Sequence, residues 1–178
     1  MKRFLSFFVM LVLTLGVMAQ TQHMKFMGIP LNGTISAFHQ KLVAKGCKPE
    51  VEYNKTAPVG ARVFIGTFFG EKASIHVYYT AETKVVYRAK ACIERDSEDM
   101  IIRIYNEVKS ALEEKYPDAY MDKGEHNGYE SMHFLTSQGE IVLYVSKSNV
   151  YADKYNLYID YYDAENFIKN EKSKKGVL

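Results

Sequence analysis

The sequence predicts an α+β fold of two tandem repeats, each a helix followed by an antiparallel meander. Two segments, 34–45 and 97–116, have apolar residues at helical spacing. Each is followed by segments that alternate apolar with polar residues and are rich in β-branched and aromatic side chains. Because an antiparallel sheet buries one face and leaves the other in water, we expect both helices to pack on one face of the sheet.

The first nineteen residues predict a cleavable signal peptide. Lys2 and Arg3 precede an apolar run over 4–17, and Val17-Met18-Ala19 is a typical cleavage site. The run is shorter than the roughly 20 residues that span a bilayer. We therefore expect an exported protein, periplasmic or secreted, with no membrane span after cleavage.

The remaining chain predicts one domain over 20–168, with halves at about 28–95 and 96–168 and a basic flexible tail over 169–178. The whole net charge of +2 comes from Lys2 and Arg3, because residues 1–19 hold no acid. The exported part is therefore formally neutral, which argues against a nucleic-acid partner.

Both predicted helices have recognisable ends. The first has Thr34 as N-cap and Gly46 as its left-handed stop. The second has acidic residues in its first turn and ends before Pro117. Their apolar stripes are Ile35, Phe38 and Leu42, and Ile101, Ile104, Tyr105, Val108 and Leu112.

Three strands are predicted after each helix, separated by short turns. The turns fall at 70–72, 81–83 and 137–139, and a longer loop covers 146–153. The predicted strands are 62–69, 73–80 and 84–93 in the first half and 131–136, 140–145 and 154–162 in the second.

Three short motifs carry a resemblance. They are GIPLNGTI at 28–35, KGC at 45–47 and FIGTFFG at 64–70. With them the chain resembles small exported proteins of Bacteroidetes whose function is unassigned, and its layout is similar to the beta-lactamase inhibitory protein fold. The resemblance implies the fold and the compartment, and no functional residue is transferred from it.

Common catalytic signatures are absent from the sequence. It has no Gly-x-Ser-x-Gly nucleophile motif, no pair of histidines four residues apart, and no phosphate-binding glycine loop. Asp160, Asp163 and Glu165 are interpreted as a solvated turn and helix start. We therefore expect no cofactor and a non-catalytic binding module. The alternative is an uncommon hydrolase of envelope polymers that uses Asp160 or His133 in a cleft.

The two cysteines, Cys47 and Cys92, leave two alternatives open. Export to an oxidising compartment favours a disulfide between them. Two buried thiols that behave as small apolar residues are the other alternative. Neither cysteine belongs to a Cys-x-x-Cys pair, so redox catalysis is not expected.

Strand alternation predicts a binding surface on the open face of the sheet. If Ile75 and Val77 point toward the helices, their neighbours along the strand point away. Tyrosine and arginine on an exposed face contribute strongly to protein interfaces, although such residues are also ordinary sheet surface. We expect an unknown protein or peptide, in the envelope or outside the cell, to bind through His76, Tyr78, Arg88, Tyr144, Tyr158 and Tyr162.

We predict that the exported form begins at Gln20, because signal peptidase cleaves after a small residue such as Ala19. Intact-mass measurement of the exported protein checks this. A chain that still carries Met1, or one with a lipid attached, would contradict it.

Overall fold

A computed structural model describes residues 22–148, 151 and 153–175. The predicted signal peptide and its cleavage site lie outside the described residues. The fold is α+β, as predicted, and the main sheet is antiparallel throughout. The described helices are α2 (Ile35–Ala44), α3 (Val51–Thr56), α4 (Glu98–Lys115) and α5 (Ala164–Lys175).

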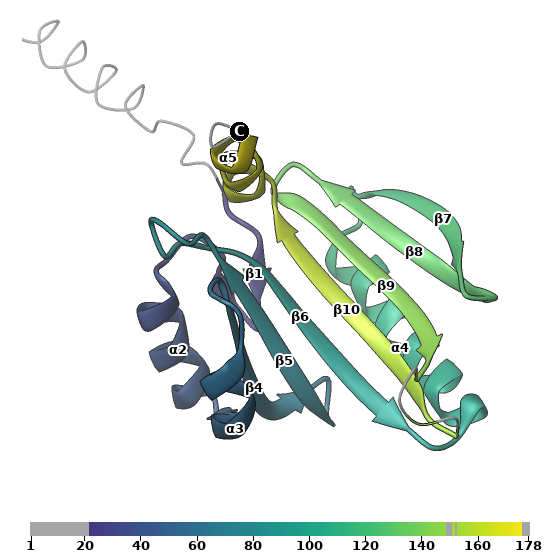
Figure 1. Ribbon diagram of the computed structural model, residues 1–178. Helices are drawn as coiled ribbons and strands as arrows, with labels where there is room; N and C mark the ends of the chain where they lie inside the picture. The colour runs from purple at the N-terminus through teal and green to yellow at the C-terminus, as the bar shows by residue number, and fades with distance from the viewer. Residues whose placement is uncertain (1–21, 149–150, 152, 176–178) are drawn as a thin grey trace, which may run out of the picture.

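Eight strands form one sheet in the order β3-β4-β5-β6-β10-β9-β8-β7, and β1 and β2 form a separate hairpin (Figure 1). The hairpin strands are β1 (Lys25–Phe26) and β2 (Ile29–Pro30). The first half of the sheet contains β3 (Lys48–Pro49), β4 (Ala61–Phe68), β5 (Glu71–Tyr79) and β6 (Val86–Arg95). The second half contains β7 (Tyr120–His126), β8 (Tyr129–Thr136), β9 (Gly139–Lys147) and β10 (Tyr155–Asp163).

The caps of α2 are those that the sequence predicts, and α4 also begins at a hydroxyl cap. The Thr34 hydroxyl accepts a hydrogen bond from the Ala37 amide, and Gly46 has a φ of 86° after the last turn of α2. The Ser97 hydroxyl accepts from the Met100 amide at the start of α4. These local interactions make both helix boundaries readable from the sequence.

The core lies between one face of the sheet and the helices α2 and α4. The predicted apolar stripe of α4 is buried, as are Phe38 and Leu42 of α2, and all belong to one continuous hydrophobic cluster. In Figure 1, α4 lies behind β9 and β10. The strands contribute alternate residues to this cluster, among them Ile75, Val77, Leu143 and Ile159.

Strand β7 and helices α3 and α5 are absent from the sequence-based prediction. All seven residues of β7 are exposed, so this edge strand lacks the alternation that marks a half-buried strand. The signal that was missed is Asn127-Gly128. Their φ angles of 51° and 83° form the tight turn between β7 and β8.

Helix α5 replaces part of the predicted flexible tail, since it continues as far as Lys175. Buried groups hold its start. The Asp163 carboxylate accepts hydrogen bonds from the amides of Met24 and Asn166 and lies 3.0 Å from His23 Nδ1. The Asn166 side chain donates to the Leu31 carbonyl. These bonds tie the N-terminal hairpin to the end of β10.

Among the described residues, no helix is both long enough and apolar enough to cross a membrane.

We predict that Gly139→Ala destabilises the protein by at least about 3 kcal/mol. Gly139 has a φ of 151°, and a Cβ there would lie 1.9 Å from the backbone oxygen of Tyr162. Urea unfolding measures the loss. Gly128→Ala is the matched control, because its φ of 83° is strained but no heavy atom lies within 4 Å of its Cβ position. It should lose about 1–2 kcal/mol, and equal losses in both variants would contradict the clash.

Candidate functional site: the open face of the sheet

The face of the sheet opposite α2 and α4, which we call the open face, carries all six residues singled out in the sequence. The strand pairings arrange them in three cross-strand rows, and each of the six is half-buried. The rows are Ser74-Cys92-Tyr158-Tyr144, His76-Lys90-Asp160-Val142 and Tyr78-Arg88-Tyr162-Glu140. The predicted strand parity is therefore correct for β5, β6, β9 and β10, while the binding role of these residues stays a prediction.

A buried ion pair occupies the centre of the open face. Arg88 Nε donates to Asp160 Oδ1 at 2.9 Å, and Arg88 Nη2 donates to Asp160 Oδ2 at 2.5 Å. Such a two-point contact fixes the plane of the guanidinium. Burial disfavours the charge on Arg88, but hydrogen bonding and Coulombic attraction to Asp160 outweigh burial and raise the Arg88 pKa. Arg88 therefore stays charged.

Two tyrosine rings lie against the Arg88 guanidinium. Its central carbon is 4.6 Å from the ring centroid of Tyr78 and 4.7 Å from that of Tyr162. Both distances are within the range of cation–π attraction. The Tyr162 hydroxyl also donates to Asp160 Oδ2 at 3.1 Å. Burial raises the pKa of both phenols, so they remain neutral donors.

A second aromatic row runs beside this cluster. The rings of Tyr144 and Tyr158 are stacked with centroids 4.8 Å apart, and His126 lies 4.5 Å from Tyr144. The Lys90 ammonium lies 4.9 Å from the Tyr158 ring. Burial, followed by the Asp160 charge, raises the pKa of Tyr144 to about 12. Burial also lowers the pKa of Lys90, and the positive charge of Arg88 adds to that effect.

His76 lies at the β5 side of the open face. Its Nε2 is 3.3 Å from the Ser74 hydroxyl, and its ring packs edge-on against Tyr53 of α3 with centroids 6.3 Å apart. Burial and, next, the charge of Lys90 lower the His76 pKa to about 4. The imidazole is therefore neutral near pH 7.

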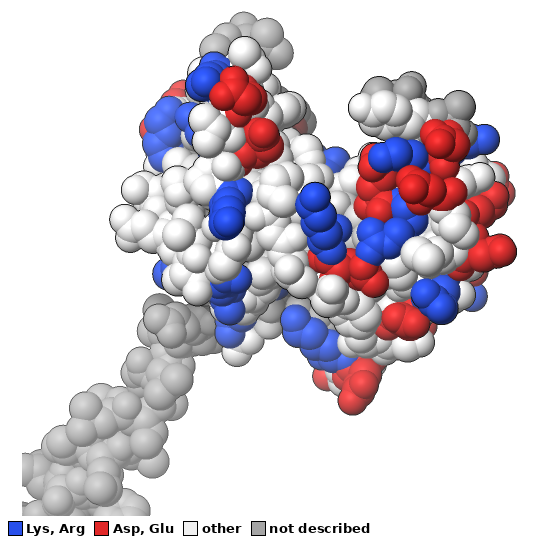
Figure 2. Space-filling view, turned by 90° about the horizontal axis from the view of Figure 1, so that it is seen from below, with Lys and Arg blue, Asp and Glu red and all other residues white. Residues whose placement is uncertain are grey.

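Helices α3 and α5 stand at the margins of the open face. Tyr53 of α3 packs on His76, and Phe167 of α5 packs on Tyr162 and Tyr87 with centroids 5.6 and 6.2 Å apart. Figure 2, seen from below, shows a hollow between two lobes on the side that faces the viewer in Figure 1. Tyr53 and Phe167 therefore border the open face.

The sequence-based interpretation of Asp160 as part of a solvated turn is wrong. The Asp160 side chain is almost fully buried because Arg88 and Tyr162 engage both oxygens. Asp163 is equally buried by its bonds to the N-terminal segment. His133, the other residue of the hydrolase alternative, lies 2.6 Å from Glu140 Oε1. The period-two pattern places Asp160 on the open face but cannot show which cation it meets.

Cys47 and Cys92 are both free thiols in the structure; Cys47 is buried, and Cys92 is only partly buried. Cys47 is buried in the core cluster against Gly66. Cys92 lies in the row of Tyr158 on the open face, with its Sγ 3.6 Å from Asn156 Oδ1. The sheet therefore separates the two sulfur atoms. Burial raises both thiol pKa values, so neither cysteine has the properties of a reactive nucleophile.

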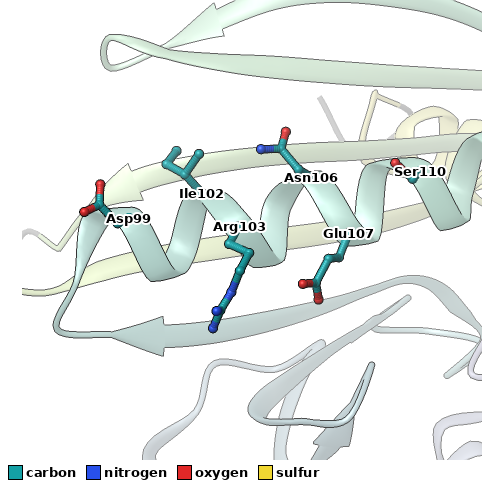
Figure 3. Close-up of a pocket in the computed structure, with 6 residues that line it drawn as sticks. All are labelled: Asp99, Ile102, Arg103, Asn106, Glu107 and Ser110. Carbon is teal, nitrogen blue, oxygen red and sulfur yellow. The ribbon is translucent and has the colours of Figure 1, made fainter.

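Two other kinds of site, a metal centre and a pocket along α4, have less support in the structure. The described residues contain no group of three or more side chains arranged to hold a metal ion. A shallow depression along the outer side of α4 is lined by residues of that helix alone, so it is open to solvent (Figure 3). Its lining residues are Asp99, Ile102, Arg103, Asn106, Glu107 and Ser110.

Comparisons with known proteins found no match: no family model, no curated protein and no solved structure is similar to this chain.

We predict that His76 makes the protein less stable in mild acid. Because its pKa is depressed in the folded state, the unfolded chain binds the extra proton between pH 6.5 and about 4. The stability that neutral His76 provides is therefore complete above pH 6.5 and lost as pH falls toward about 4. Urea unfolding at pH 7 and pH 4.5 should show a loss in the wild type that exceeds the loss in His76→Gln by about 1–3 kcal/mol. Equal losses in the two proteins would show that His76 is not responsible.

Proposed function

We propose that this protein is an exported, non-catalytic binding module that recognises a protein or peptide through the open face of its sheet. One observation carries the proposal. Tyr78, Arg88 and Tyr162 form a stacked set, and Tyr144 stacks on Tyr158 beside it. These are the residue types that dominate protein interfaces, because they bury a large area while their polar ends form hydrogen bonds.

The ordering of these side chains before binding supports the proposal. Arg88 is held by Asp160 and by two rings, so it has little rotamer freedom left to lose when a partner binds. Immobilising a flexible side chain costs roughly 0.5–1.5 kcal/mol in binding. A surface that has already lost this freedom binds more tightly for the same contacts.

The chemistry of the face indicates what the partner offers. Neutral phenols donate hydrogen bonds, so carbonyl or carboxylate oxygens suit Tyr144 and Tyr158, whereas the Tyr162 hydroxyl already donates to Asp160. Lys90 lies across the strand from Asp160, whose carboxylate is already engaged by Arg88, and it forms no ion pair with any described residue. An acidic group of the partner would give Lys90 an ion-pair partner. We propose a peptide or protein segment that combines an apolar or aromatic residue with a carboxylate.

The candidate catalytic groups Asp160 and His133 are less suited to hydrolysis than the open face is to binding. A general base needs a free carboxylate or imidazole that reaches the water it activates. Asp160 is occupied by Arg88 and Tyr162, and His133 is occupied by Glu140. The occupied state of these groups favours binding over catalysis.

We also propose that the two halves are tandem repeats of one helix-and-meander unit with a layout like that of the beta-lactamase inhibitory protein fold. Two features support this. Helix α2 precedes β3–β6 and helix α4 precedes β7–β10, and the last strands of both sets, β6 and β10, are neighbours. Periplasmic or secreted localisation rests on the N-terminal sequence alone.

We predict that Tyr78→Ala and Tyr158→Ala each weaken partner binding by about 1–3 kcal/mol, since each removes an interface ring. Immobilised wild-type protein is used to capture proteins from the envelope fraction and culture medium of the producing organism. Each captured protein is then titrated against the variants by calorimetry.

Tyr120→Ala is the matched control, because Tyr120 is 69% exposed on the edge strand β7. Circular dichroism and urea unfolding confirm that all three variants fold. A partner that binds Tyr78→Ala and Tyr158→Ala as tightly as it binds Tyr120→Ala would overturn the assignment of the open face.

A further inference from the structure

A second concave site lies on the opposite side of the sheet from the open face. It is a cleft of about 350 Å³ between the C-terminal half of α4, the end of α2 and the β4–β5 turn. This volume lies within the range of small-molecule pockets. The inner wall is apolar and includes Phe68, Val108 and Leu112, with Tyr161 of β10 at its base.

Tight turns hold the rim of the cleft. Met27 and Phe69, which line it, are the first residues of two hairpin turns. Met27 and Gly28 have φ angles of 51° and 75°, and Phe69 and Gly70 have 53° and 78°. Positive φ at both central residues defines a rigid two-residue hairpin turn. The backbone of these two rim segments is therefore set by the turns.

The hydroxyl of Tyr161 lacks a partner. Tyr161 is only 4% exposed, its ring packs edge-on against Phe26, and it lines the cleft. Within the described part of the chain its hydroxyl forms no hydrogen bond, and no buried side-chain oxygen is sealed from solvent without a partner. Because Tyr161 is one of the residues that line the cleft, we infer that its oxygen faces the cleft. Burial raises the Tyr161 pKa, so the group is a neutral phenol that can donate a hydrogen bond.

Two lysines stand at the cleft. Lys45 follows the last turn of α2, and Lys115 is the last residue of α4. Lys115 lies 5.0 Å from the Tyr116 ring, and among the described residues neither lysine forms an ion pair. An apolar cleft with two unpaired ammonium groups is complementary to an amphipathic anion.

We propose that this cleft binds a small aryl or acyl carboxylic acid that has a hydroxyl or carbonyl group at the end opposite its carboxylate. The carboxylate lies between Lys45 and Lys115. The apolar body contacts Phe68, Val108 and Leu112, and the distal polar atom hydrogen-bonds with the Tyr161 hydroxyl. Simple saturated fatty acids have no group for Tyr161, so they are disfavoured. The site is independent of the open face, and neither proposal rests on the other.

The test uses three matched probes on the full exported protein. They are 3-(4-hydroxyphenyl)propionate, its uncharged amide, and 3-phenylpropionate, which lacks the hydroxyl. Calorimetry and the methyl NMR signals of Val108, Ala111 and Leu112 measure binding. We expect the hydroxy acid to bind with one-to-one stoichiometry and to shift these signals. The amide cannot form ion pairs with the lysines, and the deoxy acid cannot form the hydrogen bond with Tyr161. Each should therefore bind about three- to tenfold more weakly than the hydroxy acid.

Variants separate the two contacts. The double variant Lys45→Gln/Lys115→Gln should bind the hydroxy acid roughly three- to thirtyfold more weakly than the wild type does. It should also bind the acid and the amide with equal affinity. Tyr161→Phe should remove the difference between the hydroxy and deoxy acids and leave the melting temperature unchanged, because the hydroxyl has no partner to lose. Lys41→Gln, on α2 but outside the cleft, and Tyr158→Ala, on the open face, should bind all probes as the wild type does.

The absence of methyl shifts with the hydroxy acid at about 10 mM, where a ligand with a Kd of about 1 mM would be nearly saturating, would overturn the proposal. Equal binding of acid and amide to the wild type would overturn it too. Octanoate serves as a fourth probe, and tighter binding of octanoate than of the hydroxy acid would overturn the proposal as well.

Discussion

The pairing of β6 with β10 is the constraint on which the rest of the structure depends. These two strands come from different halves of the chain and form an antiparallel ladder from Tyr155↔Arg95 to Tyr162↔Arg88. A shift of one residue would turn every side chain of β10 to the other face. The register that buries Leu157 and Ile159 in the core also places Tyr158, Asp160 and Tyr162 beside Arg88 and Lys90. Core packing thus determines the arrangement of the open face.

Strand β10 contributes polar groups to both sides of the sheet, and each is satisfied differently. On the open face the Asp160 carboxylate is saturated by Arg88 and Tyr162. At the end of the strand the Asp163 carboxylate is saturated by backbone amides and by His23. Burying a carboxylate is costly without such partners. The exception is Tyr161, whose hydroxyl has no hydrogen-bond partner among the residues that the structure describes, and it lies where a cleft reaches the sheet.

The two candidate sites therefore differ in kind. The open face is broad, and its side chains hold one another in place through stacking and ion pairing, as suits a macromolecular partner. The cleft is small and apolar, with the Tyr161 hydroxyl at one end and, at the other, two lysines that form no ion pair with any described residue, as suits a small molecule. Because the sheet lies between them, a change in one site leaves the contacts of the other intact.

The sequence by itself determined the local elements: both helices, six strands and the faces to which the residues of β5, β6, β9 and β10 point. Thr34, Gly46 and Ser97 act within one turn of chain, and the alternation around Ile75 and His76 records which side is buried. Only the tertiary structure decided the pairing of β6 with β10, the ion pair between Arg88 and Asp160, the separation of Cys47 from Cys92, and the cleft below Tyr161. These features join residues far apart in the chain. The register and packing that bring them together depend on the whole core rather than on any short segment.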